Sequence, residues 1–130
     1  LASEGVISIE LGEFTNYKEE QEKIESVCRQ LEHRIDQLKE IPLILISDDC
    51  KFTAQHFNNL IWTCFTRSNP SHDIYGVRSS IDYKHWGCKG PLIIDCRMKP
   101  HSAPILELDP KVEASVDKLG AKGGPLHGII

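Results

Sequence analysis

Two adjacent carboxylates, Asp48 and Asp49, follow a run of mainly aliphatic residues over 42–47. Paired carboxylates supply the hard oxygen ligands that a divalent cation prefers, so this pair is a candidate cation site. Asp is also common where a strand ends, because its side chain bonds the backbone of the following turn. We therefore interpret Asp48 and Asp49 as residues that close a buried strand and cap the next turn, and we predict no metal site.

Imidazole and thiol groups are a second source of chemistry, as zinc ligands or nucleophiles. A structural zinc site needs two closely spaced ligand pairs, and only His85 and Cys88 are suitably close. Cys88 could also pair with His85 or His101 as a thiol–imidazole couple, but the spacing does not fix that pair. We interpret these groups as loop histidines and packed thiols and predict no catalytic residue on this chain. The full set is His72, His85, Cys88, Cys96 and His101.

The segment over 66–73, Thr-Arg-Ser-Asn-Pro-Ser-His-Asp, carries the most unexplained polarity. Arg67 falls at the end of a predicted helix, where the helix dipole favours a cation. Asp73 follows a short distance on and can accept a hydrogen bond from Arg67. We predict an Arg67–Asp73 clamp that holds a helix-to-strand turn. The alternative is a loop that shapes a ligand or partner surface.

The apolar pattern predicts the elements that position these residues. A strand over 6–11 precedes an amphipathic helix over 17–39, which an Asn16–Glu19 capping box starts. Aliphatic runs over 42–47 and 91–96 are typical of strands covered on both faces. The other predicted elements are a helix capped by Thr53 and broken at 68–71, a strand over 74–77, an irregular stretch over 78–90, an extended loop over 97–108, and a helix started by Asp109-Pro110 and closed by Gly120 in the left-handed region.

Strands that alternate with helices predict an α/β fold: a three-layer sandwich with a mostly parallel or mixed sheet flanked by helices. We predict one such domain over residues 1–120 and a Gly-rich tail over 121–130. Ligands of such sheets gather at the carboxyl ends of the strands. The carboxylate pair, the 66–73 segment and the 97–101 segment would lie near that edge.

The composition excludes several classes of protein. The chain has 130 residues, with 15 Lys and Arg against 19 Asp and Glu, and a formal net charge of −4. This mild acidity argues against a nucleic-acid groove, and no apolar run approaches the roughly 20 residues of a membrane span. Five cysteines without a C-x-x-C pair favour a reducing, cytoplasmic compartment. The start at 1–5 lacks Met, and we expect it to be a processed or excised end of something longer.

Three stretches of the chain resemble a known family. The 66–73 segment matches the family's T-R-x-x-P-x-x-D stretch, and 84–95 is similar to its later Gly-Lys-x-[IV]-[IV]-Asp-like run. Asp48-Asp49 stands where the family carries D-D-D-I-D-P. From about residue 6 to 119 the chain resembles the C-terminal domain of the UbiD-type decarboxylases, such as 3-polyprenyl-4-hydroxybenzoate and ferulic acid decarboxylases.

The resemblance implies a fragment of a carboxy-lyase that acts on an aromatic or unsaturated carboxylic acid. The family's prenylated-FMN pocket, divalent metal site and catalytic Arg–Glu–Glu set belong to the preceding domain, and no residue here matches them. The chain alone would then be inactive and bind no cofactor, while contributing to a homo-oligomer with the rest of the parent decarboxylase. By position, Tyr83, His85 and Trp86 would form part of the substrate-pocket wall. The implied structural residues are Thr66, Arg67, Pro70 and Asp73.

The later acids and the Pro of D-D-D-I-D-P are missing from 48–53. Two alternatives to the family reading remain open. Asp48, Asp49 and Lys99 resemble the acidic pocket and lysine of a response-regulator receiver. The chain would then be a stand-alone receiver-like or other regulatory binding module without catalysis. A small cysteine-dependent enzyme is the other alternative, and it requires a depressed pKa for the Cys88 thiol.

Overall fold

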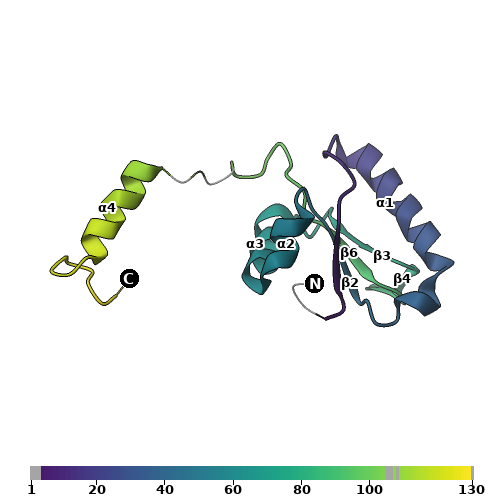
Figure 1. The fold of residues 1–130 in the computed structure, drawn as a ribbon. Coiled ribbons are helices and arrows are strands. Elements are labelled where there is room, and N and C mark those ends of the chain that lie inside the picture. The colour runs from purple at the N-terminus through teal and green to yellow at the C-terminus, as the bar shows by residue number, and fades with distance from the viewer. Residues whose placement is uncertain (1–3, 105–106, 108, 130) are drawn as a thin grey trace.

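The computed structural model describes residues 4–104, 107 and 109–129, so residues 1–3 of the unusual start lie outside the described part. Three strands, β1 (Val6–Ile9), β2 (Leu43–Ile46) and β6 (Leu92–Asp95), run parallel to one another, and β3 (Ile74–Gly76) runs antiparallel to β6. Helices lie on both faces of this sheet (Figure 1), which confirms the predicted α/β fold with a mostly parallel, mixed sheet. The spatial order of the strands is β1, β2, β6 and β3.

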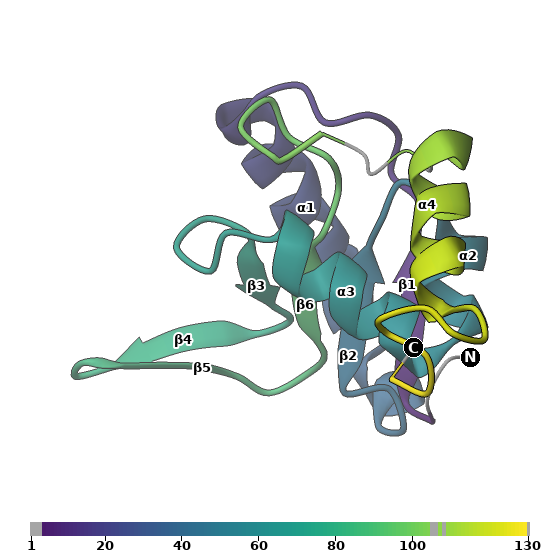
Figure 2. The same ribbon diagram turned by 90° about the vertical axis from the view of Figure 1, so that its left-hand side faces the viewer.

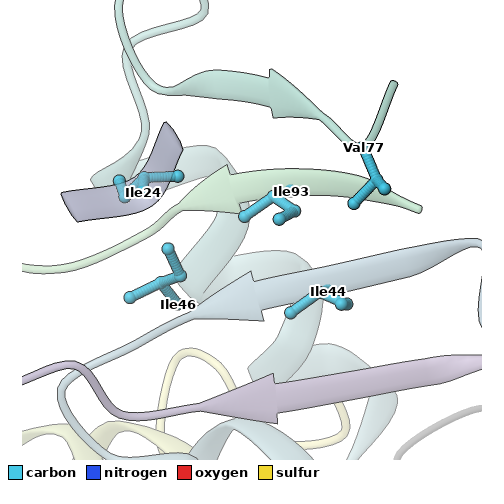
Figure 3. Packing of buried hydrophobic residues seen from close by; sticks show 5 residues of the cluster. All are labelled: Ile24, Ile44, Ile46, Val77 and Ile93. Carbon is cyan, nitrogen blue, oxygen red and sulfur yellow. The ribbon is translucent and has the colours of Figure 1, made fainter. Parts of the chain in front are cut away.

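The aliphatic runs of β2 and β6 explain why both faces of the sheet are covered. Successive side chains of a strand point to opposite faces, so an unbroken apolar run supplies two hydrophobic layers at once. The cluster under α1 (Tyr17–Glu32) comprises Ile24, Ile44, Ile46, Val77 and Ile93 (Figure 3). The cluster under α3 (Phe57–Arg67) comprises Leu45, Leu60 and Cys96.

The helix α1 begins as the sequence predicts and ends earlier. The Asn16 side chain accepts a hydrogen bond from the Glu19 N–H at 3.1 Å, which is the N-cap half of the predicted box. A separate 3-10 turn, η1 (Ile35–Leu38), follows. The predicted continuous helix to Lys39 is therefore too long, because Arg34 leaves the helical region with φ −118° and ψ 18°.

The predicted helix capped by Thr53 is in fact two helices, α2 (Cys50–Gln55) and α3. Asp49 is the N-cap of α2: its Oδ1 accepts the Phe52 N–H at 2.9 Å, which confirms the capping role predicted for this residue. Thr53 lies inside α2 and donates its hydroxyl to the Asp49 carbonyl at 2.8 Å. The extended backbone of His56 (φ −140°, ψ 148°) ends α2 and starts α3.

The stretch over 78–90 is not irregular, as the sequence predicts, but contains a β-hairpin of β4 (Ser79–Asp82) and β5 (His85–Cys88). The hairpin projects away from the main sheet (Figure 2). Arg78 and Tyr83 adopt a positive φ of 55°, which turns the chain into the hairpin and across its tip. The irregular prediction is wrong because both strands are largely exposed and so lack the apolar alternation that marks a half-buried strand.

An Asp–Pro pair starts α4 (Pro110–Gly120) as predicted, since the Asp109 carboxylate accepts the Lys111 N–H at 2.8 Å. The end of α4 differs from the prediction. Gly120 remains inside the helix and is not left-handed, and Ala121 with φ −61° is the C-cap. In Figure 1 this helix lies outside the layers of the sheet.

The tail after α4 folds back on the helix, because the Leu126 N–H donates to the Leu119 carbonyl at 3.0 Å. The division into a domain over 1–120 and a tail over 121–130 stays a prediction. Within the described ranges, no helix combines the length and the apolar character that crossing a bilayer requires.

Candidate functional site at the carboxyl ends of the strands

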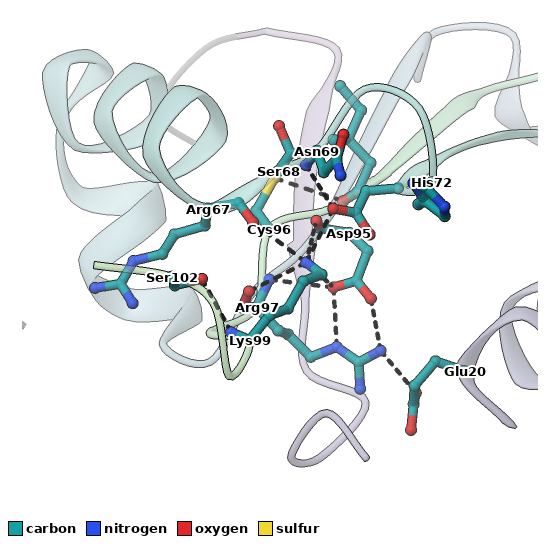
Figure 4. Close-up of polar contacts among 12 residues, drawn as sticks. Glu20, Arg67, Ser68, Asn69, His72, Asp95, Cys96, Arg97, Lys99 and Ser102 are labelled. Atoms are coloured by element: carbon teal, nitrogen blue, oxygen red, sulfur yellow. Dashed lines mark hydrogen bonds and ion pairs between the residues drawn. The ribbon is translucent and has the colours of Figure 1, made fainter. Parts of the chain in front are cut away.

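A buried cation, Arg97, is the second residue after the end of β6 and is fully shielded from solvent. Its Nε and Nη2 bind the two carboxylate oxygens of Asp95 at 3.0 and 2.7 Å. Nη2 also donates to Oε2 of Glu20 on α1 at 2.7 Å, and Nη1 donates to the Gly12 carbonyl at 3.0 Å. Arg97 therefore ties β6, α1 and the loop after β1 together, and Figure 4 shows its bonds to Asp95 and Glu20.

Lys99 is also buried, and its ammonium is surrounded by oxygen atoms. Nζ donates to the main-chain carbonyls of Arg67, Asp95 and Arg97 at 3.2, 2.9 and 3.2 Å. It forms an ion pair with Oδ2 of Asp73 at 3.3 Å. Because an ammonium group has three hydrogens, these contacts account for all of its donors.

The charges of this cluster compensate one another. Burial alone would raise the pKa of Glu20, but hydrogen bonds from Lys23, Arg97 and Thr15 outweigh burial and lower the pKa to about 2. Burial would lower the pKa of Arg97, but its bonds to Asp95 and Glu20 raise it overall. The pKa shifts of Glu20 and Arg97 therefore both favour the charged form. Its three carboxylates and three cations are Glu20, Asp73, Asp95, Arg97, Lys99 and the half-exposed Lys23.

The predicted Arg67–Asp73 clamp is wrong. Asp73 pairs with Lys99 instead, because the Lys99 ammonium lies at the end of α3 and binds the Arg67 carbonyl as well. The Arg67 side chain extends away from the buried cluster (Figure 4). Its Nη1 donates to the Met98 sulfur, and its guanidinium lies 5.3 Å from the centre of the Trp62 ring.

The other residues of the 66–73 segment hold the connection between α3 and β3. Thr66 Oγ1 donates at 2.7 Å to a carbonyl one helical turn earlier. Asp73 Oδ2 accepts the Asn69 N–H at 2.5 Å, and the Asp95 N–H donates to the Asp73 carbonyl at 2.9 Å. Pro70 is exposed in the turn. Asp73, rather than Arg67, is thus at the centre of this connection.

The sequence pattern predicts no role for Glu20 or Arg97, and Lys99 has one only in the receiver-like alternative. A usable signal lies in the run 95–99, Asp-Cys-Arg-Met-Lys, which places three charges directly after a buried strand. A strand covered on both faces delivers such charges to a buried position, where each needs a partner. Glu20 carries no comparable signal, because in the sequence it is one of several acids at the charged start of α1.

Asp48 and Asp49, the two carboxylates of the receiver-like alternative, accept hydrogen bonds from backbone N–H groups. Asp48 Oδ2 accepts the Met98 N–H at 2.7 Å, and Asp49 caps α2. Lys99 is committed to the buried cluster through three carbonyls and Asp73. This geometry disfavours the receiver-like alternative, which needs a lysine that can reach Asp48 and Asp49.

The three residues predicted for a substrate-pocket wall lie on the hairpin. Tyr83 is at its tip and 94% exposed, and His85 pairs with Asp82 across the strands. Trp86 alone of the three lines a cavity of about 510 Å³ between α1 and the β3 region. The structure therefore places all three on one hairpin but brings only Trp86 to that cavity, and the wall role stays a prediction.

The structure shows no thiol–imidazole pair among the five groups that the sequence singles out, all of which lie in its described part. His72 and His101 pack against the Tyr17 ring, with centroids 4.9 and 6.1 Å from it. Burial raises the pKa of the Cys88 thiol, which is opposite to the depressed pKa that the cysteine-dependent alternative requires. Among residues 4–104, 107 and 109–129, no three His, Cys, Asp or Glu side chains converge as metal ligands.

Similarity to known proteins relates this chain to a decarboxylase. It is 31% identical over 96 residues to a 4-hydroxybenzoate decarboxylase subunit of Chlamydia pneumoniae, a match that covers 73% of this chain and 16% of that protein. The chain is a distant, partial relative of that subunit. It is also 28% identical over 79 residues to an uncharacterized protein of Chlamydia muridarum (strain MoPn / Nigg), covering 61% of this chain and 14% of that protein.

These relatives are much longer than the region that matches. The chain spans 16% and 14% of their lengths, so the match extends to a small part of each. No family model matches the chain, and no solved structure matches it. The decarboxylase relation agrees with the family resemblance of the sequence at this coarse level.

Proposed function

We propose that this chain is the C-terminal domain of a UbiD-like carboxy-lyase that acts on an aromatic or unsaturated carboxylic acid. The observation that carries the proposal is the 31% identity over 96 residues to a 4-hydroxybenzoate decarboxylase subunit. The T-R-x-x-P-x-x-D match over 66–73 agrees with it. In the parent enzyme this domain would support assembly and form part of the substrate-pocket wall.

The hairpin is the element best suited to both roles. Ile81 and Trp86 face each other across the strands and are 73% and 45% exposed. Large apolar side chains on a projecting hairpin lose water only when another surface covers them. We propose that the adjoining domain or a second subunit supplies that surface.

Prenylated FMN and a divalent metal would be held by the rest of the parent enzyme. The described residues of this chain do not fit the metal, because no three ligand side chains converge among them. Resemblance assigns none of the flavin contacts to this chain either. The chain alone should therefore release no CO₂.

Release of CO₂ from 4-hydroxybenzoate tests the enzyme proposal. We expect no release by the 130-residue chain, with or without prenylated FMN, and release by the protein encoded together with its upstream sequence. Tight binding of prenylated FMN to the chain by itself would contradict the proposal. An upstream sequence without an Arg–Glu–Glu set would contradict it as well.

Light scattering of the parent protein tests the assembly role of the hairpin. I81D should reduce the oligomer mass, because it places a charge on the exposed apolar pair with Trp86. S80D is the matched control, since neighbouring residues of a strand point to opposite faces. Equal masses for the two variants would exclude the hairpin as the contact.

A KM for 4-hydroxybenzoate unchanged by W86A would exclude the wall role.

A further inference from the structure

Two thiols from distant parts of the sequence meet between α3 and the main sheet. Cys64 lies one turn after Leu60 on the face of α3 that packs against the buried cluster under this helix. Cys96, the first residue after β6, is a member of the same cluster. A hydrogen bond joins the two thiol groups. The fold therefore brings together two sulfur atoms that the stretch over 65–95 separates in the sequence.

Lys99 holds the two main-chain segments that carry these thiols. Its Nζ donates to the Arg67 carbonyl at 3.2 Å, three residues after Cys64. It also donates to the Asp95 carbonyl at 2.9 Å, directly before Cys96. A disulfide requires Cα atoms about 4.4–6.8 Å apart, so it forms only between segments that are already close. Thiols in contact on two segments tied by one ammonium group can reach this geometry with little movement of the backbone.

The two thiols differ in exposure and in acidity. Cys64 is partly exposed, whereas Cys96 is 0% exposed. The hydrogen bond from Cys96 lowers the pKa of the Cys64 thiol to about 7, against burial, which would raise it. The same hydrogen bond and burial raise the pKa of Cys96. Because the thiolate is the form that reacts with peroxides, Cys64 is the thiol that an oxidant attacks first.

We propose that Cys64 and Cys96 form a redox pair, which hydrogen peroxide converts from two thiols to a disulfide. The Cys64 sulfur attacks one peroxide oxygen, the O–O bond breaks, and the products are a Cys64 sulfenic acid and water. The Cys96 sulfur then attacks the Cys64 sulfur and displaces the hydroxyl group, which leaves as water with the Cys96 proton. In total, two thiols and one peroxide give one disulfide and two waters. A dithiol reductant reverses the reaction by thiol–disulfide exchange.

The disulfide would lock the end of α3 to the end of β6. It closes a loop over 64–96 that contains β3, the hairpin and β6. A crosslink that closes a long loop stabilises a protein mainly by restricting the unfolded chain, so oxidation should raise the urea midpoint of unfolding by about 1–2 M. This inference does not depend on the decarboxylase proposal.

Counting thiols after a brief treatment with hydrogen peroxide at neutral pH tests the pair. The treated chain is unfolded in the presence of iodoacetamide, which labels every remaining thiol. We expect the labelled cysteines to fall from five to three, because a disulfide consumes two, and dithiothreitol to restore five. A non-reducing digest should contain one crosslinked pair of peptides, joined through Cys64 and Cys96.

Three cysteine variants assign the roles within the pair. C64S should consume peroxide about tenfold more slowly, because it removes the thiol with the lowered pKa. C96S should stop at the Cys64 sulfenic acid, which dimedone traps. C50S is the matched control, since Cys50 is likewise partly exposed, and it should still form the Cys64–Cys96 disulfide. The digest of the wild-type chain needs no variant, so it remains decisive if C64S or C96S does not fold.

Any of three results overturns the proposal. Five labelled cysteines after a treatment that oxidises the urea-unfolded chain would show that the native pair does not react. A crosslink between other cysteines would assign the reaction to another site. Equal rates of peroxide consumption by C64S and C50S would remove Cys64 from the first step.

Discussion

The buried arginine of the charge cluster allows the sharpest test of the structure. R97M keeps much of the side-chain volume and removes the guanidinium, which leaves Asp95 and Glu20 as buried carboxylates without their shared cation. Removing one partner of a buried ion pair costs about 3–5 kcal/mol. Domains of this size have a total stability of about 5–15 kcal/mol, so R97M should retain a native state of much lower stability.

Urea unfolding followed by circular dichroism measures this loss. With a urea slope of about 2 kcal/mol/M, a loss near 4 kcal/mol lowers the unfolding midpoint by about 2 M. K39M is the control, because Lys39 and its partner Asp36 are 71% and 86% exposed and such pairs contribute about 0–1 kcal/mol.

A double variant tests whether the loss arises from the cluster itself. In R97M/E20Q the buried Glu20 charge is removed together with the cation, so the two changes should cost less than the sum of the single variants. Additive costs, or an R97M midpoint equal to that of K39M, would refute the assignment of Arg97 as the centre of the buried cluster. If R97M does not fold, R97K should show an intermediate midpoint.

Three further predictions concern other parts of the fold. The pKa of Glu20 is lowered to about 2 from 4.5, so the stabilisation by its charge is present above pH 4.5 and is lost as the pH falls toward 2. The difference in unfolding free energy between wild type and E20Q should therefore shrink over that window, which acid titrations followed by circular dichroism measure. A Cβ at Gly76 would lie 2.5 Å from the Cβ of Cys88, so G76A should lower the free energy of unfolding by about 1–3 kcal/mol. G87A places its Cβ in open space and should not lower it, so equal melting temperatures of the two variants would contradict this packing. D49A should lower the free energy of unfolding by about 1 kcal/mol, because it removes the N-cap of α2, and D49N should restore most of that loss. Equal unfolding free energies of D49A and D49N in urea titrations would show that the cap does not stabilise the fold.

Much of the fold can be predicted from local features of the sequence, namely aliphatic runs and helix N-cap residues. The unbroken aliphatic runs of β2 and β6 identify strands covered on both faces, because only a covered strand can carry apolar residues at every position without exposing them to water. Asn16 and Asp109 start their helices because each side chain accepts an N–H of the first turn, and that interaction lies within four residues.

The hairpin and the split helix depend on less local causes. Both strands of the hairpin are largely exposed, so their sequence carries no hydrophobic period, and the positive φ of Tyr83 leaves no signal in a non-glycine residue. The break at His56 falls within a stretch whose apolar spacing continues from α2 to α3.

The partners of the buried charges are what the tertiary structure alone decides. Arg67 and Asp73 are close in sequence and of opposite charge, and yet Asp73 pairs with Lys99, and Arg67 turns to Trp62 and Met98. The sequence specifies which residues carry charge and which strands are buried. Only the packing of β3 against β6, with α1 across them, determines which charges are buried in the same cluster. A buried charge is no longer hydrated, so it must pair with the group that the fold places beside it.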